Sequence, residues 1–357
     1  MGYDPSYHPV DLSLLNQTIM PYLLGAERPE GFEEDAVRLA QNRYRANAWG
    51  LGALKFKHSF QKEESLLKDH DPIAIESDLH IWGRPFFITD SDPQSISRSI
   101  DDYLKCRTFQ EVDAIAHRML VQISPDMPHV VVPDTEGGMP TAEDFRERIF
   151  WRMRLFKQAV AGWSSGKDIK VPNGQLKSPQ ELLVDFLPNA LIELMSLFRP
   201  GWMARGYEWP TYLMNNNGMD ASVFVSPACL FTPLVDSLPG LKYSLNPTIT
   251  ENYTMGGYLP TERVLDVLSL FTHKLKHVLE KDTDEENSFS ETLDSGEDCD
   301  NEEDWDDEDW DDDSLESWDG DEISLLKIVE ALHDAHNRGF AFVEADTVYS
   351  GYGGKMN

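Results

Sequence analysis

Apolar residues recur at intervals of three and four positions in several parts of this 357-residue chain. Such spacing places them on one face of an α-helix, so each stretch predicts a helix with one buried side. The first stretch covers 12–23, where Pro21 is expected to bend the helix or end it early because proline has no N–H to donate. A second stretch, rich in Ala and aromatic residues, predicts a helix over 32–48.

Three further helices are indicated by the residues at their starts. Thr108 with Glu111, and Thr141 with Asp144, have the spacing of a capping box, in which two side chains satisfy backbone N–H groups at a helix start. The Ser-Pro-Gln-Glu run at 178–181 combines a capping hydroxyl, a proline at the first helical position and an acid at the third. Helical apolar spacing follows each of these starts, so we expect three amphipathic helices.

Shorter runs rich in β-branched and aromatic residues predict strands between the helices. These runs are 79–82 continuing to 85–88, 129–132 and 222–225. Residues 200–260 follow neither period and are rich in Pro, Gly, Asn and aromatic residues. We expect irregular structure there, held by the packing of Trp202, Trp209, Tyr212 and Tyr258.

Helical spacing returns after Pro260, is interrupted by an acidic segment, and resumes over 323–332. Gly339 then predicts a helix end, and the apolar run 340–343 predicts a buried final strand. The pattern as a whole indicates an α+β fold that is mainly helical, with a small mixed sheet and a long acidic loop inserted between two C-terminal helices.

With 41% hydrophobic and 11% aromatic residues, the chain has ample material for a core. We expect one globular body formed by 1–281 plus 323–357, with a subdivision near 165–178 left open. The segment 282–322 is expected to be a disordered acidic insertion, and we call it the acidic tract.

The acidic tract holds 23 of the chain's 63 acidic residues and contains no Lys or Arg. The net charge of the whole chain is −32, and the residues outside the tract carry only about −9 of it. Because like charges repel, such a block stays extended and hydrated until a cation or a basic partner neutralises it. Basic proteins are therefore the expected partners, and nucleic acid is not, since phosphate binding requires clustered Lys and Arg.

Several compartments and attachments are disfavoured by simple features of the sequence. The opening residues carry no basic and apolar leader, and no apolar stretch is long enough to span a bilayer, so no membrane association is expected. Cys106, Cys229 and Cys299 are odd in number and widely spaced, which matches neither a disulfide framework nor a zinc motif. A reducing cytoplasm is the expected location.

Within the tract, three tryptophans alternate with aspartates. Carboxylates can steer a basic surface toward the chain, and an indole ring can stack on Arg or Lys after docking. The partner-binding residues predicted on this basis are Asp304, Trp305, Asp306, Asp307, Trp310, Asp311, Asp312 and Trp318. Two alternatives remain open: the tract only maintains solubility, or it folds back on Arg146, Arg148, Arg152 and Arg154. An EF-hand is excluded because Gly296 is preceded by Leu293 at the third loop position and Gly320 by Leu315 at the first, where acidic residues are required.

Catalytic motifs are weak. His273 with His277, and His333 with His336, have the spacing of paired metal ligands on a helix, yet the first pair lacks the intervening Glu of a metalloprotease and has lysines instead. Surface or capping histidines are the simpler interpretation. Gly256-Gly257 is expected to form a tight turn. The sequence contains no phosphate-binding or nucleophile-elbow motif, so no cofactor, metal ion or catalytic residue is predicted.

Two segments resemble ones found in bacterial immunity-type proteins, which neutralise secreted or polymorphic toxins. One is Gly-Gly-Tyr-Leu-Pro at 256–260, followed by a Leu-rich helix, and the other is ALHDAHNRGFAFVEADTV at 331–348. Together with the opening MGYDPSYHP they cover about a fifth of the chain. The resemblance implies a stoichiometric inhibitor without catalysis of its own, and it carries no binding residue across.

The leading hypothesis is a cytoplasmic, non-catalytic immunity or inhibitor protein that captures a basic partner such as a toxin. One alternative is a hydrolase or metal-dependent enzyme with its site in 200–280. Another is an acidic, chaperone-like protein that shields basic clients without strict specificity. The sequence leaves the oligomeric state open.

Overall fold

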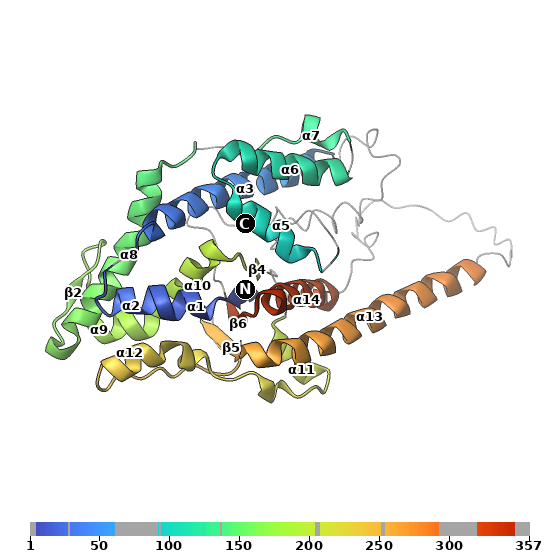
Figure 1. The fold of residues 1–357 in the computed structure, drawn as a ribbon. Helices are drawn as coiled ribbons and strands as arrows, with labels where there is room; N and C mark the ends of the chain where they lie inside the picture. Colours follow the sequence, from blue (N-terminus) through green and yellow to red (C-terminus); the bar gives the residue numbers. More distant parts are fainter. Residues whose placement is uncertain are drawn as a thin grey trace, which may run out of the picture.

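A computed structural model describes residues 5–27, 29–60, 92, 94–123, 125–135, 138–203, 208–250, 254–292 and 320–346. Helices surround a small central sheet, so the α+β, mainly helical fold expected from the sequence is observed (Figure 1). The longer helices are α3 (Phe32–Phe60), α5 (Ile96–Lys105), α6 (Phe109–Ile123), α8 (Ala142–Gly162), α10 (Leu187–Phe198), α13 (Thr261–Thr292) and α14 (Gly320–Arg338). The shorter ones are α1 (Leu12–Leu14), α2 (Met20–Leu23), α7 (Met127–Val130), α9 (Pro179–Glu181), α11 (Pro210–Asn216) and α12 (Thr232–Ser237).

The main sheet has four strands in the order β4-β1-β6-β5. They are β1 (Pro5–Val10), β4 (Trp202–Met203), β5 (Met255–Leu259) and β6 (Ala341–Asp346). All of its pairings are antiparallel, whereas a mixed sheet was expected. The separate hairpin consists of β2 (Ile169–Lys170) and β3 (Leu176–Lys177).

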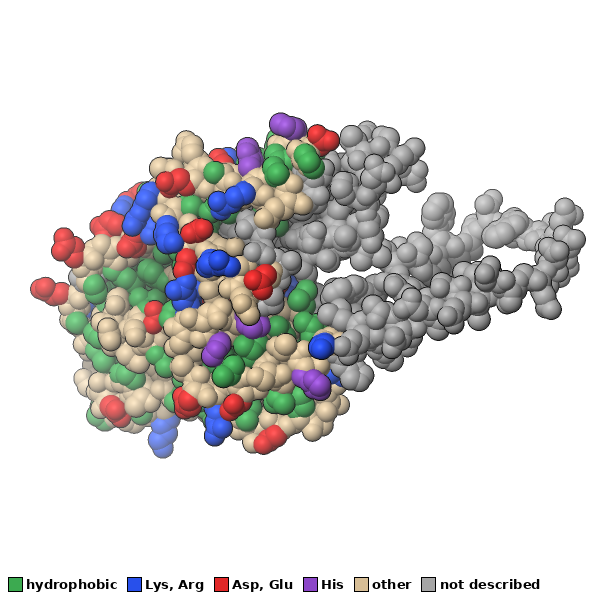
Figure 2. All heavy atoms as spheres, turned by 45° about the vertical axis from the view of Figure 1, so that its right-hand side comes forward, with side chains coloured by type: hydrophobic (Ala, Val, Ile, Leu, Met, Phe, Trp, Pro, Cys, Tyr) green, Lys and Arg blue, Asp and Glu red, His purple; other side chains and the backbone are tan. Residues whose placement is uncertain are grey.

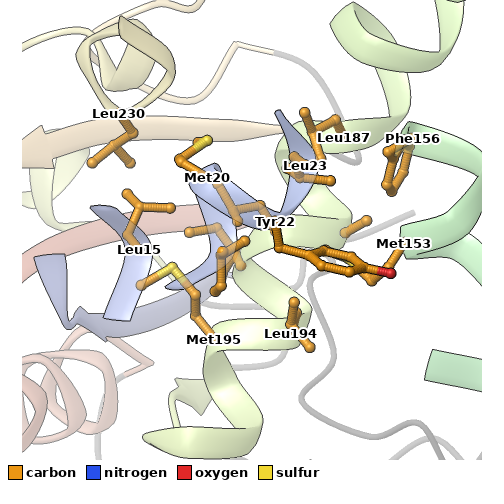
Figure 3. Packing of buried hydrophobic residues seen from close by; sticks show 14 of the residues in the cluster. Leu15, Met20, Tyr22, Leu23, Met153, Phe156, Leu187, Leu194, Met195 and Leu230 are labelled. Carbon is orange, nitrogen blue, oxygen red and sulfur yellow. The ribbon is translucent and has the colours of Figure 1, made fainter. Parts of the chain in front are cut away.

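Both faces of the sheet are covered, and each carries its own core. Because side chains alternate along a strand, Ala341, Val343 and Ala345 face one core while Phe342 faces the other. The first core packs α2, α3, α8, α10 and α12 against the sheet, and Figure 3 shows its centre around Leu15, Met20 and Leu194. The second core packs α5, α13 and α14 on the opposite face. Every residue of β1 and β6 is consequently buried.

The capping predictions are confirmed. Thr108 and Glu111 exchange bonds at the start of α6, with Glu111 N donating to Thr108 Oγ1 at 3.4 Å and Thr108 N donating to the Glu111 carboxylate at 3.0 Å. Thr141 and Asp144 form the same reciprocal box at the start of α8. Ser178 caps α9 by accepting from the backbone N–H three residues on, at 3.1 Å.

Two prolines lie inside helical segments without ending them. Met20 N–H bonds to the carbonyl of Leu15, five residues back, so a π-helical turn precedes Pro21 and the helix continues to the end of α2. The same arrangement, a π-helical turn over Leu182–Phe186, precedes Pro188 at the start of α10. A wider turn accommodates the residue that lacks an N–H, so the helix continues past Pro21 and ends soon afterwards, at Leu23.

The two described runs that were predicted as strands between the helices do not form strands. Residues 129–132 include the end of α7 and an extended segment, and residues 221–223 form a 3-10 helix. Only Val225 reaches the sheet, through an isolated bridge to Tyr258. Short apolar runs fit a strand and a buried turn equally well, so tertiary packing decides between them. The run at 79–88 lies outside the described residues.

The C-terminal prediction is largely confirmed. Gly339 ends α14 with a φ of +65°, which favours glycine, and the chain passes directly into the buried strand β6. Helix α13 continues to Thr292 and α14 begins at Gly320, so both helices extend into the segment 282–322. The boundaries predicted for the acidic tract therefore fall inside helices at both ends.

Region 200–260 consists of short elements held by aromatic packing. Trp202, Trp209 and Tyr258 are buried as expected, while Tyr212 is 41% exposed. Gly256 and Gly257 lie within β5 and not in a tight turn, which corrects the sequence prediction. A Cβ on Gly257 would lie 2.9 Å from both Pro247 O and Thr211 Cγ2, so the strand requires glycine for close approach.

Candidate functional site

The predicted partner-binding residues, from Asp304 to Trp318, all lie outside the described residues. The structure does show what holds the two ends of their segment. Helix α13 packs along α14, and Phe271 of α13 and Leu332 of α14 are fully buried in the core that the two helices share. The C-terminal end of α13 extends away from the body (Figure 1). The acidic tract is thus joined at both ends to one anchored helical pair.

The arginines on α8 are already matched by carboxylates of the folded body. The pairs are Arg146–Glu33 at 2.7 Å, Arg146–Glu143 at 2.5 Å, Arg152–Glu193, and Arg154–Glu147 at 3.1 Å. Arg148 lies close enough to Asp144 to contribute, after the hydrogen bonds from Thr141, to the lowered pKa of that carboxyl. On the face drawn in Figure 2, Lys and Arg side chains lie beside Asp and Glu side chains. These arginines offer the tract no uncompensated positive charge.

Of the two histidine pairs, the structure describes the side chains of His273, His333 and His336 but not that of His277, so a metal site is considered only for the described part of the chain. No group of three or more His, Cys, Asp or Glu side chains is arranged there to hold a metal ion. His273 is exposed on α13. His333 is half-buried on α14, and desolvation together with the neighbouring His336 lowers its pKa. The exposed His273 and His336 fit the surface interpretation of the sequence.

A hydroxyl–imidazole pair that the sequence analysis missed joins α10 to β1. Ser196 Oγ lies 3.0 Å from His8 Nδ1 and donates to the carbonyl of Ile192 at 2.8 Å, so the imidazole is the donor in the pair. Both side chains are 2% exposed. Burial, with a smaller contribution from Arg43, lowers the pKa of His8 to about 3. A neutral, enclosed pair of this kind resembles part of a catalytic triad but has no access to substrate, so its role is structural.

A carboxylate lies at the centre of the second face of the sheet. Glu344 on β6 is fully buried and accepts from Thr211 N at 3.0 Å, Thr211 Oγ1 at 2.7 Å and Gly257 N at 3.1 Å. Desolvation outweighs these bonds and raises the pKa of Glu344 to about 7. The carboxylate therefore joins β5, β6 and α11 through donors that the chain itself supplies, with Gly257 contributing because its backbone can approach closely.

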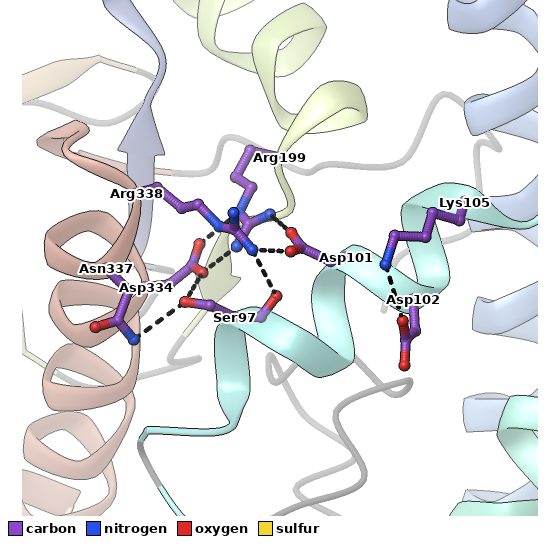
Figure 4. Close-up of polar contacts among 8 residues, drawn as sticks. All are labelled: Ser97, Asp101, Asp102, Lys105, Arg199, Asp334, Asn337 and Arg338. Carbon is purple, nitrogen blue, oxygen red and sulfur yellow. Dashed lines mark hydrogen bonds and ion pairs between the residues drawn. The ribbon is translucent and has the colours of Figure 1, made fainter.

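A second polar cluster links α5, α10 and α14 (Figure 4). Arg199, which follows α10, donates from Nε to Asp334 Oδ2 at 2.7 Å and from Nη1 to Asp101 Oδ1 at 2.8 Å. Asp334 also accepts from Ser97 Oγ at 2.8 Å. Arg338 pairs with the other oxygen of Asp101. The cluster balances two arginines against two aspartates, and its buried members, Arg199 and Asp334, are paired with each other, as buried charges require.

A cavity of about 230 Å³ adjoins this cluster. Its polar wall is formed by Asp11, Asp101, Arg199 and Arg338. Its apolar wall is formed by Leu14, Leu104, Met195, Phe198 and Phe340. No sequence motif marks this site, because its residues come from four separate stretches of the chain. Arg338 and Phe340 do fall within the segment 331–348 noted in the sequence, but no feature there indicated a cavity.

Comparisons with known proteins add no assignment: no family model, no curated protein and no solved structure matches this chain. The resemblance to immunity-type proteins is therefore left without support from any relative. Within the described residues, no helix combines the length and apolar character needed to cross a membrane.

Proposed function

We propose that this chain is a non-catalytic protein that binds a basic partner protein through the acidic tract 282–322. The observation that carries the proposal is the position of the tract: the most concentrated negative charge of the chain is joined to the anchored pair α13 and α14. A dense charge joined to a folded body attracts an oppositely charged surface over about a Debye length, roughly 8 Å at physiological salt.

Two features of the body support binding in trans over self-association. The arginines of α8 have carboxylate partners of their own, so they gain little by exchanging these for the tract. The same arginines are partly exposed to water, and an exposed ion pair contributes little stability. An ion pair between these arginines and the tract would therefore also contribute little. An external basic protein, with unpaired Lys and Arg, gains more from the tract than the body does.

A finer version of the proposal is an immunity-type inhibitor in the cytoplasm that covers the basic active site of a toxin. The segments at 256–260 and 331–348 support this version through their resemblance alone. In the described structure, residues 256–259 lie in β5, and residues 331–338 and 341–346 lie in α14 and β6. The inhibitor would then act by occupancy, with one chain bound to each toxin molecule.

The test uses a labelled peptide of about 20 residues rich in Arg, followed in stopped-flow mixing with the full chain. We expect the association rate to fall steeply with added salt in the wild type. Replacing Asp304, Asp306, Asp307, Asp311 and Asp312 by Asn should slow association and flatten the salt dependence. Replacing Trp305, Trp310 and Trp318 by Ser should leave association fast and accelerate dissociation, because the rings act after docking.

A matched control neutralises the same number of carboxylates on the exposed surface of the body, by Glu27→Gln, Glu30→Gln, Asp168→Asn, Asp185→Asn and Asp236→Asn. This variant should bind the peptide as the wild type does. Equal slowing by the control and by the tract variant would show that net charge alone is responsible, and the proposal would fail. Unchanged kinetics in the tract variant would exclude the tract as the binding element.

A further inference from the structure

The cavity of about 230 Å³ lies where the central strands meet the helices. Val10 of β1 is paired with Ala341 of β6, so Asp11 and Phe340 come together at the same end of the strand pair. Gly339 turns the chain between α14 and β6 with its positive φ, which places Arg338 at the same rim. The two ends of the sequence thus build one wall, and α5 and α10 build the other.

Most of the polar groups in the wall are already occupied. Arg199 is held by Asp334 and Asp101, and both oxygens of Asp101 accept from arginines. Two groups keep capacity for a ligand. Asp11 accepts two backbone N–H groups at Oδ1, and in the described structure its Oδ2 has no protein partner. Arg338 uses Nη2 for Asp101 and the Ser97 carbonyl, and among the described residues its Nε and Nη1 have none.

The remaining wall is apolar, so the hydrocarbon group of a ligand can be buried against it. It comprises Leu14, Leu104, Met195, Phe198 and Phe340. Met195 is 3% exposed, and the other four are partly buried at the rim. An apolar group that enters leaves water and contacts this wall, which favours binding in proportion to the area buried.

The charge and the volume of the cavity restrict the class of ligand further. Arg199, Asp334 and Asp101 bond mainly to one another, so the groups of the wall that stay open to a ligand in the described structure are one carboxylate oxygen of Asp11 and two guanidinium nitrogens of Arg338, which have opposite charges. A molecule that is neutral overall but carries both charges would satisfy Asp11 and Arg338 together. The cavity is smaller than the roughly 300–1,000 Å³ of sites for drug-sized ligands. At about 30 Å³ for each water of the liquid, it has the volume of about eight waters, close to the heavy-atom count of a small amino acid.

We propose that this cavity binds a free α-amino acid with an apolar side chain. Its ammonium group lies against the Asp11 carboxylate, its carboxylate accepts from the Arg338 guanidinium, and its side chain packs against the apolar wall. The site is separate from the acidic tract, and it does not depend on the proposed function.

The first experiment is titration calorimetry of the full chain with leucine and phenylalanine. N-acetylleucine lacks the ammonium group, leucinamide lacks the carboxylate, and glycine lacks the apolar group. We expect binding of leucine or phenylalanine, and an affinity about 10- to 100-fold weaker for each of the three analogues. Absence of binding by any apolar amino acid up to ~10 mM would overturn the proposal. Equal binding of leucine and leucinamide, or of leucine and N-acetylleucine, would also overturn it, because the site would then recognise only one charge.

The second experiment uses Asp11→Asn and Arg338→Lys. Asn caps a helix as well as Asp does, so Asp11→Asn keeps the two backbone bonds and removes only the charge. Each variant should weaken leucine binding about tenfold or more, while Arg263→Gln, on the exposed side of α13, should not. Leucine binding that survives both cavity variants would contradict the proposal. Binding should persist when Asp304, Asp306, Asp307, Asp311 and Asp312 are all replaced by Asn, which separates this result from the test of the tract.

Discussion

Arg199 and Asp334 form a buried ion pair between the end of α10 and the middle of α14, with Arg199 Nε donating to Asp334 Oδ2 at 2.7 Å. The two side chains are 7% and 0% exposed. Asp101 and Ser97 on α5 complete their hydrogen bonding, so three helices distant in sequence meet at one group of charges (Figure 4).

Removing one partner of this pair should destabilise the fold strongly. Asp334→Asn leaves the Arg199 guanidinium buried without its full counter-charge, and we expect a loss of about 3–5 kcal/mol in the free energy of unfolding. Urea unfolding followed by far-UV circular dichroism measures it. Asp102→Asn is the control, since the Asp102–Lys105 pair is exposed on the same helix as Asp101 and should matter little. Similar losses in both variants would show that burial does not govern this pair.

Glu344 should make stability fall as pH rises through the weakly acidic range. Its pKa in the folded chain is raised from 4.5 to about 7, so the folded state keeps a proton that the unfolded state has released. This contribution decreases with a slope of up to about 1.4 kcal/mol per pH unit between about pH 4.5 and 7. Comparing urea unfolding of the wild type and Glu344→Gln from pH 4.5 to 8 isolates it. Parallel curves for the two proteins would rule out the shift.

His8 should act in the opposite direction. Its pKa in the folded chain is lowered from 6.5 to about 3, so protonation favours the unfolded state. The stability that His8 contributes is complete above about pH 6.5 and is lost as pH falls toward 3, again by up to about 1.4 kcal/mol per unit. His8→Asn should remove this loss relative to the wild type. A nuclear magnetic resonance titration that shows His8 protonating near pH 6.5 in the folded protein would refute the prediction.

Gly257 should not tolerate a larger side chain. A Cβ at this position would lie 2.8–2.9 Å from Phe224, Pro247 and Thr211, so Gly257→Ala should cost about 1–3 kcal/mol of unfolding free energy. Gly162 near the end of α8 offers a matched control, because the nearest atom to its added Cβ is 4.0 Å away. Gly162→Ala should be neutral or stabilising by up to about 1 kcal/mol, since alanine favours the helix. Thermal unfolding of both variants measures these effects. A loss of stability only in Gly257→Ala indicates steric crowding at that position, and not a general effect of replacing glycine by alanine.

The sequence predicted those parts of the fold that depend on local chemistry. Helix starts at Thr108, Thr141 and Ser178 follow from side chains that bond to neighbouring N–H groups, and the end of α14 follows from Gly339. Strand β1 escaped prediction because two of its six residues, Pro5 and Pro9, are prolines, which argue against a strand when they occur within such a run. Its strand character comes from pairing with β6, more than 300 residues away, which no local pattern reveals.

For the same reason, the sequence indicated the acidic tract but not the cavity or the buried polar groups. The acidic tract is visible in the sequence because it is contiguous, although its residues from Asp304 to Trp318 lie outside the described structure. The cavity and the buried groups His8, Arg199 and Glu344 depend on contacts between distant segments. Composition cannot indicate which of many acids and arginines will be brought together and desolvated.

The central place of β1 in the sheet has a consequence for how the protein forms. Residues 5–10 are synthesised more than 300 residues before their main partner, residues 341–346. The sheet cannot close before residues 341–346 have been made, and until then both cores lack their shared wall. Closing this strand pair is therefore expected to be a slow step of folding, because contacts between residues far apart in sequence form slowly.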